Sequence, residues 1–180
     1  MSGKRVLLGI TASAAAFKGV ALASAFRRRG FEVDAVLTPN AARLVSPRQL
    51  ACITARRVLW TEFADDPGDD PAPHVRLTED LSLMVIAPAT ADFLARLSLG
   101  LGDDLLTTTA LACNSPMVVA PAMHNRMWRN PVVQEHVERL RGRGVVFAGP
   151  VDGDLACGDS GAGRMMEPPD ILQVCLELML

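Results

Sequence analysis

Residues 83–93 read LMVIAPATADF, a run of five apolar residues followed directly by small and polar ones. A run that is apolar at every position predicts a strand buried on both of its faces, as in a sheet covered by helices. A helix is predicted immediately afterwards, over 89–100. Because parallel strands need such a crossover helix to connect them, the stretch predicts a parallel sheet built from strand–helix units.

The same alternation continues along the 180-residue chain. Further apolar strands are predicted at 4–10, 32–37, 117–120 and 145–148. Further helices are predicted over 13–29, with Ser13 as N-cap, and over 40–53, 103–112, 126–142 and 169–179. Proline-rich 64–73 and glycine-rich 149–168 are predicted to be loops. We therefore expect a single-domain, doubly wound α/β fold, flavodoxin- or Rossmann-like, with a parallel sheet and helices on both faces.

The composition excludes several classes of protein. The net charge of −2 gives no electrostatic case for binding nucleic acid or an anionic membrane. The first ten residues hold an apolar run too short for a signal peptide, and no other run approaches the roughly 18 residues of a spanning helix. We therefore expect a cytoplasmic protein. The four cysteines lack the spacing of metal ligands, so no metal is expected.

Ligands of doubly wound sheets bind beyond the carboxyl ends of the strands, so the loops there form the candidate site. GITAS at 9–13 offers small residues and a helix N-terminus, which suit a phosphate, although Ser13 could equally be only an N-cap. The loop is not GxGxxG, which favours a single terminal phosphate over a dinucleotide. Polar residues also follow other strands, at Thr38, in PATAD at 88–92 and in GDDLLTTT at 102–109.

The stretch PAMHNRMW at 121–128 places His124 and Asn125 where another buried strand ends. A site that must hold an anionic group beside an apolar, flat ligand could use these residues. A second histidine, His74, follows the acidic loop. A lone histidine is more often structural or merely exposed than catalytic, so both readings stay open for His74 and for His124.

With these stretches in view, nearly the whole chain resembles the homo-oligomeric flavin-containing cysteine decarboxylases. That family includes phosphopantothenoylcysteine decarboxylase and the lantibiotic-type peptidyl-cysteine decarboxylases. The matching stretches are GITASAAAFK at 9–18, the histidine of PHVRL at 73–77, APATADFLARLSLGLGDDLLTT at 87–108, PAMHNRMW at 121–128 and ACGDSGAGRMMEP at 156–168. Each stretch alone is modest, but five of them at the family's order and spacing are specific.

The resemblance implies FMN as the cofactor, with its phosphate near Ser13, and a homo-oligomer that is a trimer or a multiple of trimers. It implies His74 as the active-site histidine and 149–168 as a substrate clamp in which Cys157 is an acid. The cofactor-binding residues that it implies are Gly9, Thr11, Ser13, Thr38, Pro88, Ala89, Thr90, Thr107 and Thr108. The substrate-binding residues that it implies are Met123, His124, Asn125, Met127 and Arg164.

Three positions depart from the family's pattern. His124 stands where the family usually has asparagine after PAM, although Asn125 follows it, so either residue could hold the substrate carboxylate. Asp92 stands for the asparagine of the family's PASANT-like string. Ser82 stands where an aspartate is expected eight residues after the active-site histidine.

The chemistry explains why such a site needs a flavin. Loss of CO2 from a cysteine carboxylate leaves a carbanion that requires an electron sink. The resemblance implies that the flavin oxidises the thiol to a thioaldehyde and that CO2 then leaves to give an enethiolate. His74 would assist thiol deprotonation, because an imidazole changes its protonation near neutral pH.

Two substrates remain open, together with a role that is not catalytic. Cys157 favours phosphopantothenoylcysteine of coenzyme A biosynthesis, because that branch needs a proton donor for reductive release. The chain ends at Leu180 without the fused ligase common in bacterial versions, which favours a peptide. We expect oxidative decarboxylation of a peptide's C-terminal cysteine to an aminoenethiol, with phosphopantothenoylcysteine as the alternative. An FMN-bound regulatory partner is the third reading.

Overall fold

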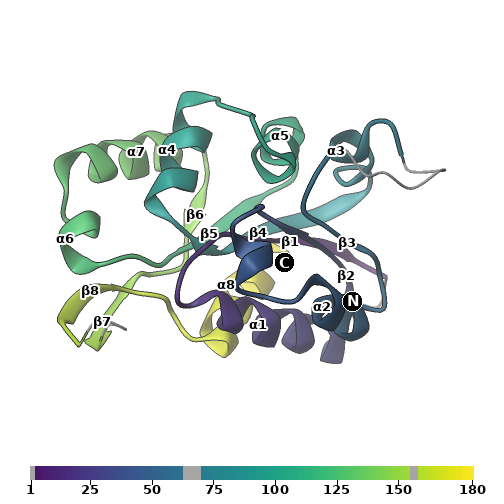
Figure 1. The fold of residues 1–180 in the computed structure, drawn as a ribbon, viewed down its shortest axis with the longest axis horizontal. Coiled ribbons are helices and arrows are strands. Elements are labelled where there is room, and N and C mark those ends of the chain that lie inside the picture. The colour runs from purple at the N-terminus through teal and green to yellow at the C-terminus, as the bar shows by residue number, and fades with distance from the viewer. Residues whose placement is uncertain (1–2, 63–69, 155–157) are drawn as a thin grey trace.

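A six-stranded parallel sheet forms the centre of the protein, with the strand order β3-β2-β1-β4-β5-β6 (Figure 1). The computed structural model describes residues 3–62, 70–154 and 158–180. The strands are β1 (Arg5–Ile10), β2 (Glu32–Leu37), β3 (Val58–Leu59), β4 (Leu81–Ala89), β5 (Met117–Pro121) and β6 (Val146–Phe147). The sheet confirms the predicted doubly wound α/β fold. The stretch 83–93 forms most of its central strand β4 and the start of α4.

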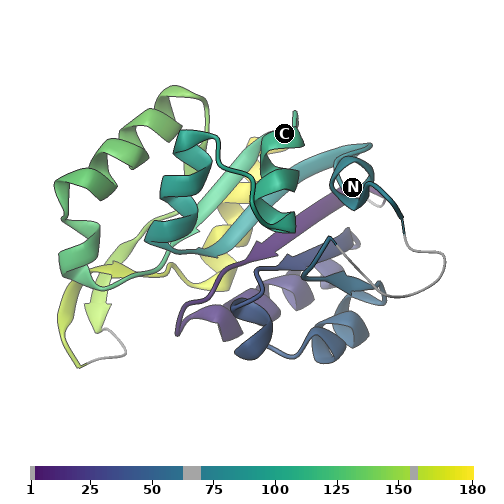
Figure 2. The ribbon, with the colours of Figure 1, turned by 45° about the horizontal axis from the view of Figure 1, so that its top comes forward.

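Helices cover both faces of the sheet (Figures 1 and 2). One face carries α1 (Ala16–Arg28), α2 (Pro47–Thr54) and α8 (Pro168–Leu178), whose buried side chains pack with those of β1, β2 and β4. The other face carries α4 (Ala91–Leu99), α5 (Leu105–Ala112) and α7 (Pro131–Gly142), which enclose a second apolar core. Short elements complete the fold, namely η1 (Ala41–Arg43), α3 (Pro73–Arg76) and α6 (Asn125–Trp128).

The strand order reverses between β1 and β4, so their carboxyl ends form the crevice where such folds bind ligands. Thr11 joins the loop after β1 to the end of β4 and the loop that follows it. Its hydroxyl donates to Pro88 O at 2.9 Å and accepts from the Thr90 N–H at 3.0 Å. Position 19 requires glycine for a steric reason, because a Cβ at Gly19 would lie 2.6 Å from Ala87 O. These contacts fix the start of α1 against the end of β4.

Three predicted helices have different bounds. The helix predicted over 13–29 begins at Ala16, with Ala15 at its N-cap, because Ser13 lies in the preceding turn. The helix predicted over 40–53 divides into η1 and α2, since Pro47 starts a new helix that Ser46 caps. The helix predicted over 126–142 divides for the same reason at Asn130–Pro131, with Asn130 Oδ1 accepting from the Val132 N–H.

The predicted loop over 149–168 contains an antiparallel hairpin. Its strands are β7 (Val151–Asp154) and β8 (Ser160–Arg164), and the start of α8 follows at Pro168. The loop prediction was wrong here because glycine-rich strands without apolar alternation carry no strand signal. No helix formed by the described parts of the chain is long and apolar enough to cross a membrane.

Candidate active site

A pocket of about 580 Å³ opens at the carboxyl edge of the sheet. Residues from the turn before α1, from the loop between β5 and α6, and from the β7–β8 hairpin line it. The structure therefore brings together four of the predicted site residues, which are Ser13, Met123, His124 and Arg164. Its size falls within the range of small-molecule and cofactor sites.

Two cations reach this pocket and share one carboxylate. Lys18 Nζ and Arg164 Nη2 each lie 2.7 Å from Glu167 Oε1. The hydrogen bond from Lys18 is the main reason that the pKa of Glu167 is lowered below its usual value. Two cations with one shared counter-charge, beside the Ser13 hydroxyl, suit a phosphate group.

His124 caps α6 with its own side chain. Its Nδ1 accepts a hydrogen bond from the Arg126 N–H at 3.1 Å, and its Nε2 lies 2.9 Å from Asp159 Oδ2. Since Nδ1 is an acceptor, the proton of the neutral ring belongs on Nε2, which donates to Asp159. His124 thus presents an N–H donor at the pocket, in a place where a substrate carboxylate could also accept it.

Asn125 follows at the first position of α6 and binds the hairpin. Its Nδ2 donates to Ser160 O at 3.0 Å, while the Met123 N–H donates to Gly163 O at 3.0 Å. A side chain at Gly163 would overlap Met123 O, so glycine allows this close approach. Asn125 does not line the pocket. Between the two residues left open by the sequence, the geometry favours His124 as the carboxylate donor.

The predicted cofactor residues divide into two groups by burial. Gly9, Thr11, Pro88, Ala89 and Thr107 are buried. Thr11 joins two loops, and Thr107 completes a capping box with Asp104 at the start of α5. Contact between this group and the cofactor stays a prediction, and in the chain alone interior packing and hydrogen bonding occupy these residues.

The other group keeps hydroxyls that can still donate to a ligand. Ser13, Thr38, Thr90 and Thr108 are half-buried. The Oγ atoms of Ser13, Thr38 and Thr90 accept from the backbone N–H groups of Ala15, Ala41 and Phe93. Each of these hydroxyls therefore retains its own proton for donation. The Ser13 hydroxyl, which lines the pocket with Lys18 and Arg164, and the hydroxyls at the ends of the other strands make a donor set that fits FMN.

His74 lies away from this pocket. It belongs to α3, at the opposite side of the molecule from the β7–β8 hairpin in both views (Figures 1 and 2). Its Nδ1 is 3.7 Å from Glu62 Oε1, and its side chain is 32% exposed. The predicted acid Cys157 lies outside the described residues. Within one chain, the structure does not bring His74 together with His124.

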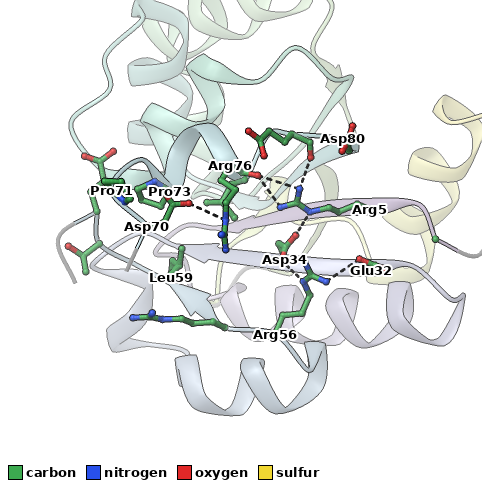
Figure 3. A pocket seen from close by; sticks show the side chains of 16 residues that line it. Arg5, Glu32, Asp34, Arg56, Leu59, Asp70, Pro71, Pro73, Arg76 and Asp80 are labelled. Atoms are coloured by element: carbon green, nitrogen blue, oxygen red, sulfur yellow. Dashed lines mark hydrogen bonds and ion pairs between the residues drawn. The ribbon is translucent and has the colours of Figure 1, made fainter. Parts of the chain in front are cut away.

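A larger pocket, of about 1040 Å³, lies near α3 at the amino edge of the sheet (Figure 3). Asp34 is buried there and accepts from Arg5 Nε and Arg56 Nε, each at 2.5 Å. The hydrogen bond that Arg56 donates to Asp34 raises the pKa of Arg56. Because Arg5 and Arg56 both pair with Asp34, these three residues tie the starts of β1 and β2 together.

The remaining predicted substrate residue, Met127, is 48% exposed on α6. The sequence missed Lys18, whose signal was a single charge in the otherwise apolar start of a helix. It also missed Asp159, because no local pattern connects a loop aspartate with a histidine 35 residues away. In the described ranges, no group of three or more His, Cys, Asp and Glu could hold a metal ion.

Comparison with known proteins identifies the family. Residues 1–180 match the family model described as Flavoprotein. The chain belongs to the flavoprotein family. Among curated flavoprotein relatives, the coenzyme A biosynthesis bifunctional protein CoaBC of Vibrio vulnificus (strain YJ016) is 39% identical over 175 residues. That match covers 97% of this chain and 43% of the relative, so the chain spans less than half of its relative's length.

Solved flavoproteins agree with this assignment. A PPC decarboxylase variant in complex with pantothenoylaminoethenethiol is 33% identical, with a TM-score of 0.84 and 97% of each chain covered. The FMN-dependent cysteine decarboxylase SpaF is 31% identical, with a TM-score of 0.78, over 96% of this chain and 97% of that one. The predicted family of FMN-dependent cysteine decarboxylases and its cofactor, FMN, are confirmed.

Proposed function

We propose that this chain decarboxylates phosphopantothenoylcysteine, with FMN as its cofactor, in coenzyme A biosynthesis. One observation carries the proposal, which is the 39% identity to a protein named for coenzyme A biosynthesis over 97% of this chain. The likeness to a PPC decarboxylase, at 33% identity and a TM-score of 0.84, supports the same substrate. We therefore prefer the alternative substrate over the peptide that the sequence slightly favoured.

The charges of the pocket support a phosphorylated substrate. Lys18 and Arg164 are cationic, Asp154 is the one anionic residue among the described residues that line the pocket, and His124 offers an N–H. With FMN bound, three anionic groups need binding, which are the phosphate of FMN and the phosphate and carboxylate of the substrate. Lys18 and Arg164 suit a phosphate by charge, and the Nε2–H of His124 suits the carboxylate.

His124, Met123, His74 and Cys157 have separate roles in the proposed reaction. FMN, when bound, would accept two electrons from the substrate so that CO2 can leave, and its reduced form would return them to give the reduced product. His124 orients the carboxylate through Nε2–H, and Met123 provides an apolar wall of the pocket. The imidazole of His74 accepts the thiol proton as a general base. Cys157 returns a proton to the enethiolate when the reduced product is released.

We further propose that a second copy of the chain completes the site. The helix α3, which carries His74, lies at the opposite side of the molecule from the β7–β8 hairpin, which lines the pocket with His124 (Figure 1). We infer that one chain does not bring both histidines to one substrate. Val75 on α3 and Leu111 on α5 are large apolar side chains that remain exposed, as is Leu101 before α5. Exposed apolar groups of this size favour association. A closed homo-oligomer, such as a trimer, would bring His74 of one copy to the pocket of the next.

Mass spectrometry with two substrates tests the proposed reaction. The FMN-loaded protein is incubated with phosphopantothenoylcysteine and, separately, with a peptide that ends in cysteine. Loss of CO2 alone from phosphopantothenoylcysteine is the expected result. Loss of CO2 and two hydrogens from the peptide alone would instead establish the peptide reaction, and no product from either would indicate a binding role. Cys157→Ser should stall the reductive release from phosphopantothenoylcysteine.

A further inference from the structure

Glu62 and His74 carry two buried atoms that have no hydrogen-bond partner. Glu62 Oε1 and His74 Nδ1 are both inaccessible to solvent and unpaired, and they face each other at 3.7 Å. An unpaired polar atom in the interior costs about 1–3 kcal/mol. A shift of about 1 Å would bring the two atoms to the roughly 2.8 Å of a charge-assisted hydrogen bond, which would satisfy both.

The neighbouring charges leave Glu62 as the carboxylate for His74. Asp70 Oδ2 forms an ion pair with Arg76 Nε at 3.0 Å, although it has no hydrogen-bond partner either, and Asp70 Oδ1 accepts from the Ala72 N–H at 2.9 Å. The helix α5 packs against α3 but carries no charged residue. Among the described residues, no ion pair other than that with Glu62 involves His74.

We propose that Glu62 is a positioning residue that fixes the tautomer of His74. An ionised carboxylate can only accept a hydrogen bond, so Nδ1 must carry the proton of the neutral ring. The lone pair then lies on Nε2, which is the form that can take a proton from a thiol. Since Nδ1 is buried while 32% of the side chain is exposed, the exposed part of the ring lies away from Glu62. Glu62 also stabilises the imidazolium that forms when the proton arrives.

This inference rests on the proposed function, because only a general base needs a fixed tautomer. It assigns a role to a residue outside the five matching stretches, in the segment that leads into the acidic loop. Glu62 holds the histidine from the side opposite the reacting atoms and need not touch the substrate.

Nitrogen-15 NMR of the histidine side chains in the FMN-loaded protein tests the inference directly. The signal of His74 is assigned by its loss in His74→Asn, since the chain has only three histidines. The Nδ1–H tautomer is expected in the wild type, and a mixture or the Nε2–H tautomer in Glu62→Gln. With turnover measured on the same samples, Glu62→Gln should lower kcat about ten- to a hundredfold with little change in KM. Glu62→Asp, which keeps the carboxylate, should recover part of the loss.

Glu79→Gln is the matched control, because Glu79 is an exposed carboxylate of the same region and its side chain forms no hydrogen bond or ion pair with another described residue. It should change neither the tautomer nor kcat. An Nε2–H tautomer in the wild type overturns the inference, even if Glu62→Gln fails to fold. An unchanged tautomer and kcat in a folded Glu62→Gln overturns it as well. Wild-type turnover in His74→Asn would instead defeat the proposed general base, while the tautomer of His74 is still read independently.

Discussion

The imidazole of His124 is hydrogen-bonded to the carboxylate of Asp159, with 2.9 Å between Nε2 and Oδ2. Asp159 therefore accepts the hydrogen bond that a substrate carboxylate would accept from His124. A substrate that binds there must replace Asp159 as the acceptor. We expect His124→Ala to raise KM about tenfold or more, as for the loss of a hydrogen bond to a charged group, with a smaller effect on kcat. Steady-state kinetics measures both constants.

Asn125→Ala serves as the comparison for His124→Ala. Asn125 binds the hairpin through Ser160 O, so its loss should loosen the hairpin and change KM less than His124→Ala does. A larger rise in KM for Asn125→Ala would transfer the carboxylate contact to Asn125.

The ion pair between Lys18 and Glu167 should make stability depend on pH. Lys18 lowers the pKa of Glu167 in the folded protein, below the unfolded value of about 4.3. The stabilisation is then fully present above that unfolded value and is lost as pH falls through the lower folded one. Glu167→Gln should cost less than about 1 kcal/mol of unfolding free energy at pH 7, because the carboxylate is 45% exposed.

Denaturant unfolding at pH 7 and at pH 3 measures this effect. The difference between wild type and Glu167→Gln should shrink at the lower pH. Glu135→Gln removes an exposed carboxylate for which no ion pair is recorded and should show no such change. A difference that is the same at both pH values would mean that the ion pair does not form in solution.

His74→Asn should retain FMN and lose turnover by about a hundredfold or more, because a general base typically contributes factors of this size. The visible spectrum of bound flavin reports the cofactor, and product formation reports turnover. If His74 serves the pocket of another copy, mixing His74→Asn with His124→Ala creates sites with the kcat and KM of the wild type, which are detected at substrate concentrations well below the KM of His124→Ala. About a quarter of the sites would then combine both intact groups, provided that the subunits exchange at random. No recovery after verified exchange would place both residues in one chain's site.

Gly163→Ala should detach the hairpin from the loop before α6. Gly163 has φ +144°, and a Cβ would overlap Met123 O, so both the backbone and the contact would be strained. We expect a loss of about 1–3 kcal/mol in stability together with a rise in KM. Gly142→Ala is the control, because a Cβ at Gly142 has no neighbour within 4 Å. Equal melting temperatures of the two variants would contradict the close contact.

The sequence predicted the central architecture because the strands β1, β2, β4 and β5 are apolar at most positions, which is a local property. It did not predict β3, since Val58 and Leu59 form only two residues of strand and pair with β2 through tertiary contact. The β7–β8 hairpin was not predicted for a related reason. Its strands are stabilised by contacts with residues 123–125, which lie far away in the chain.

The candidate site was likewise predicted where its signals are local and was missed where they depend on tertiary contacts. Polar residues at strand ends predicted where the pocket lies, and Ser13, Met123, His124 and Arg164 do line it. Burial was not predictable from one residue type, so the enclosure of Thr11 and Thr107 was not foreseen, and their contact with the cofactor stays a prediction. Pairings across the fold, such as Lys18 with Glu167, required the three-dimensional arrangement.

The hydroxyl of Thr11 has a consequence for loop grafting between members of the family. The turn that contains Ser13 and the turn after β4 share that single hydroxyl, which serves Pro88 O and the Thr90 N–H together. A valine of the same shape would leave the Thr90 N–H without its partner, whereas Pro88 O would still accept from the backbone N–H of residue 11 at 3.2 Å. Serine would preserve both hydrogen bonds of the hydroxyl. The two turns should therefore be exchanged together. A chimera that takes only one of them from a relative would lose the match between the residue at position 11 and the backbone groups of the turn after β4.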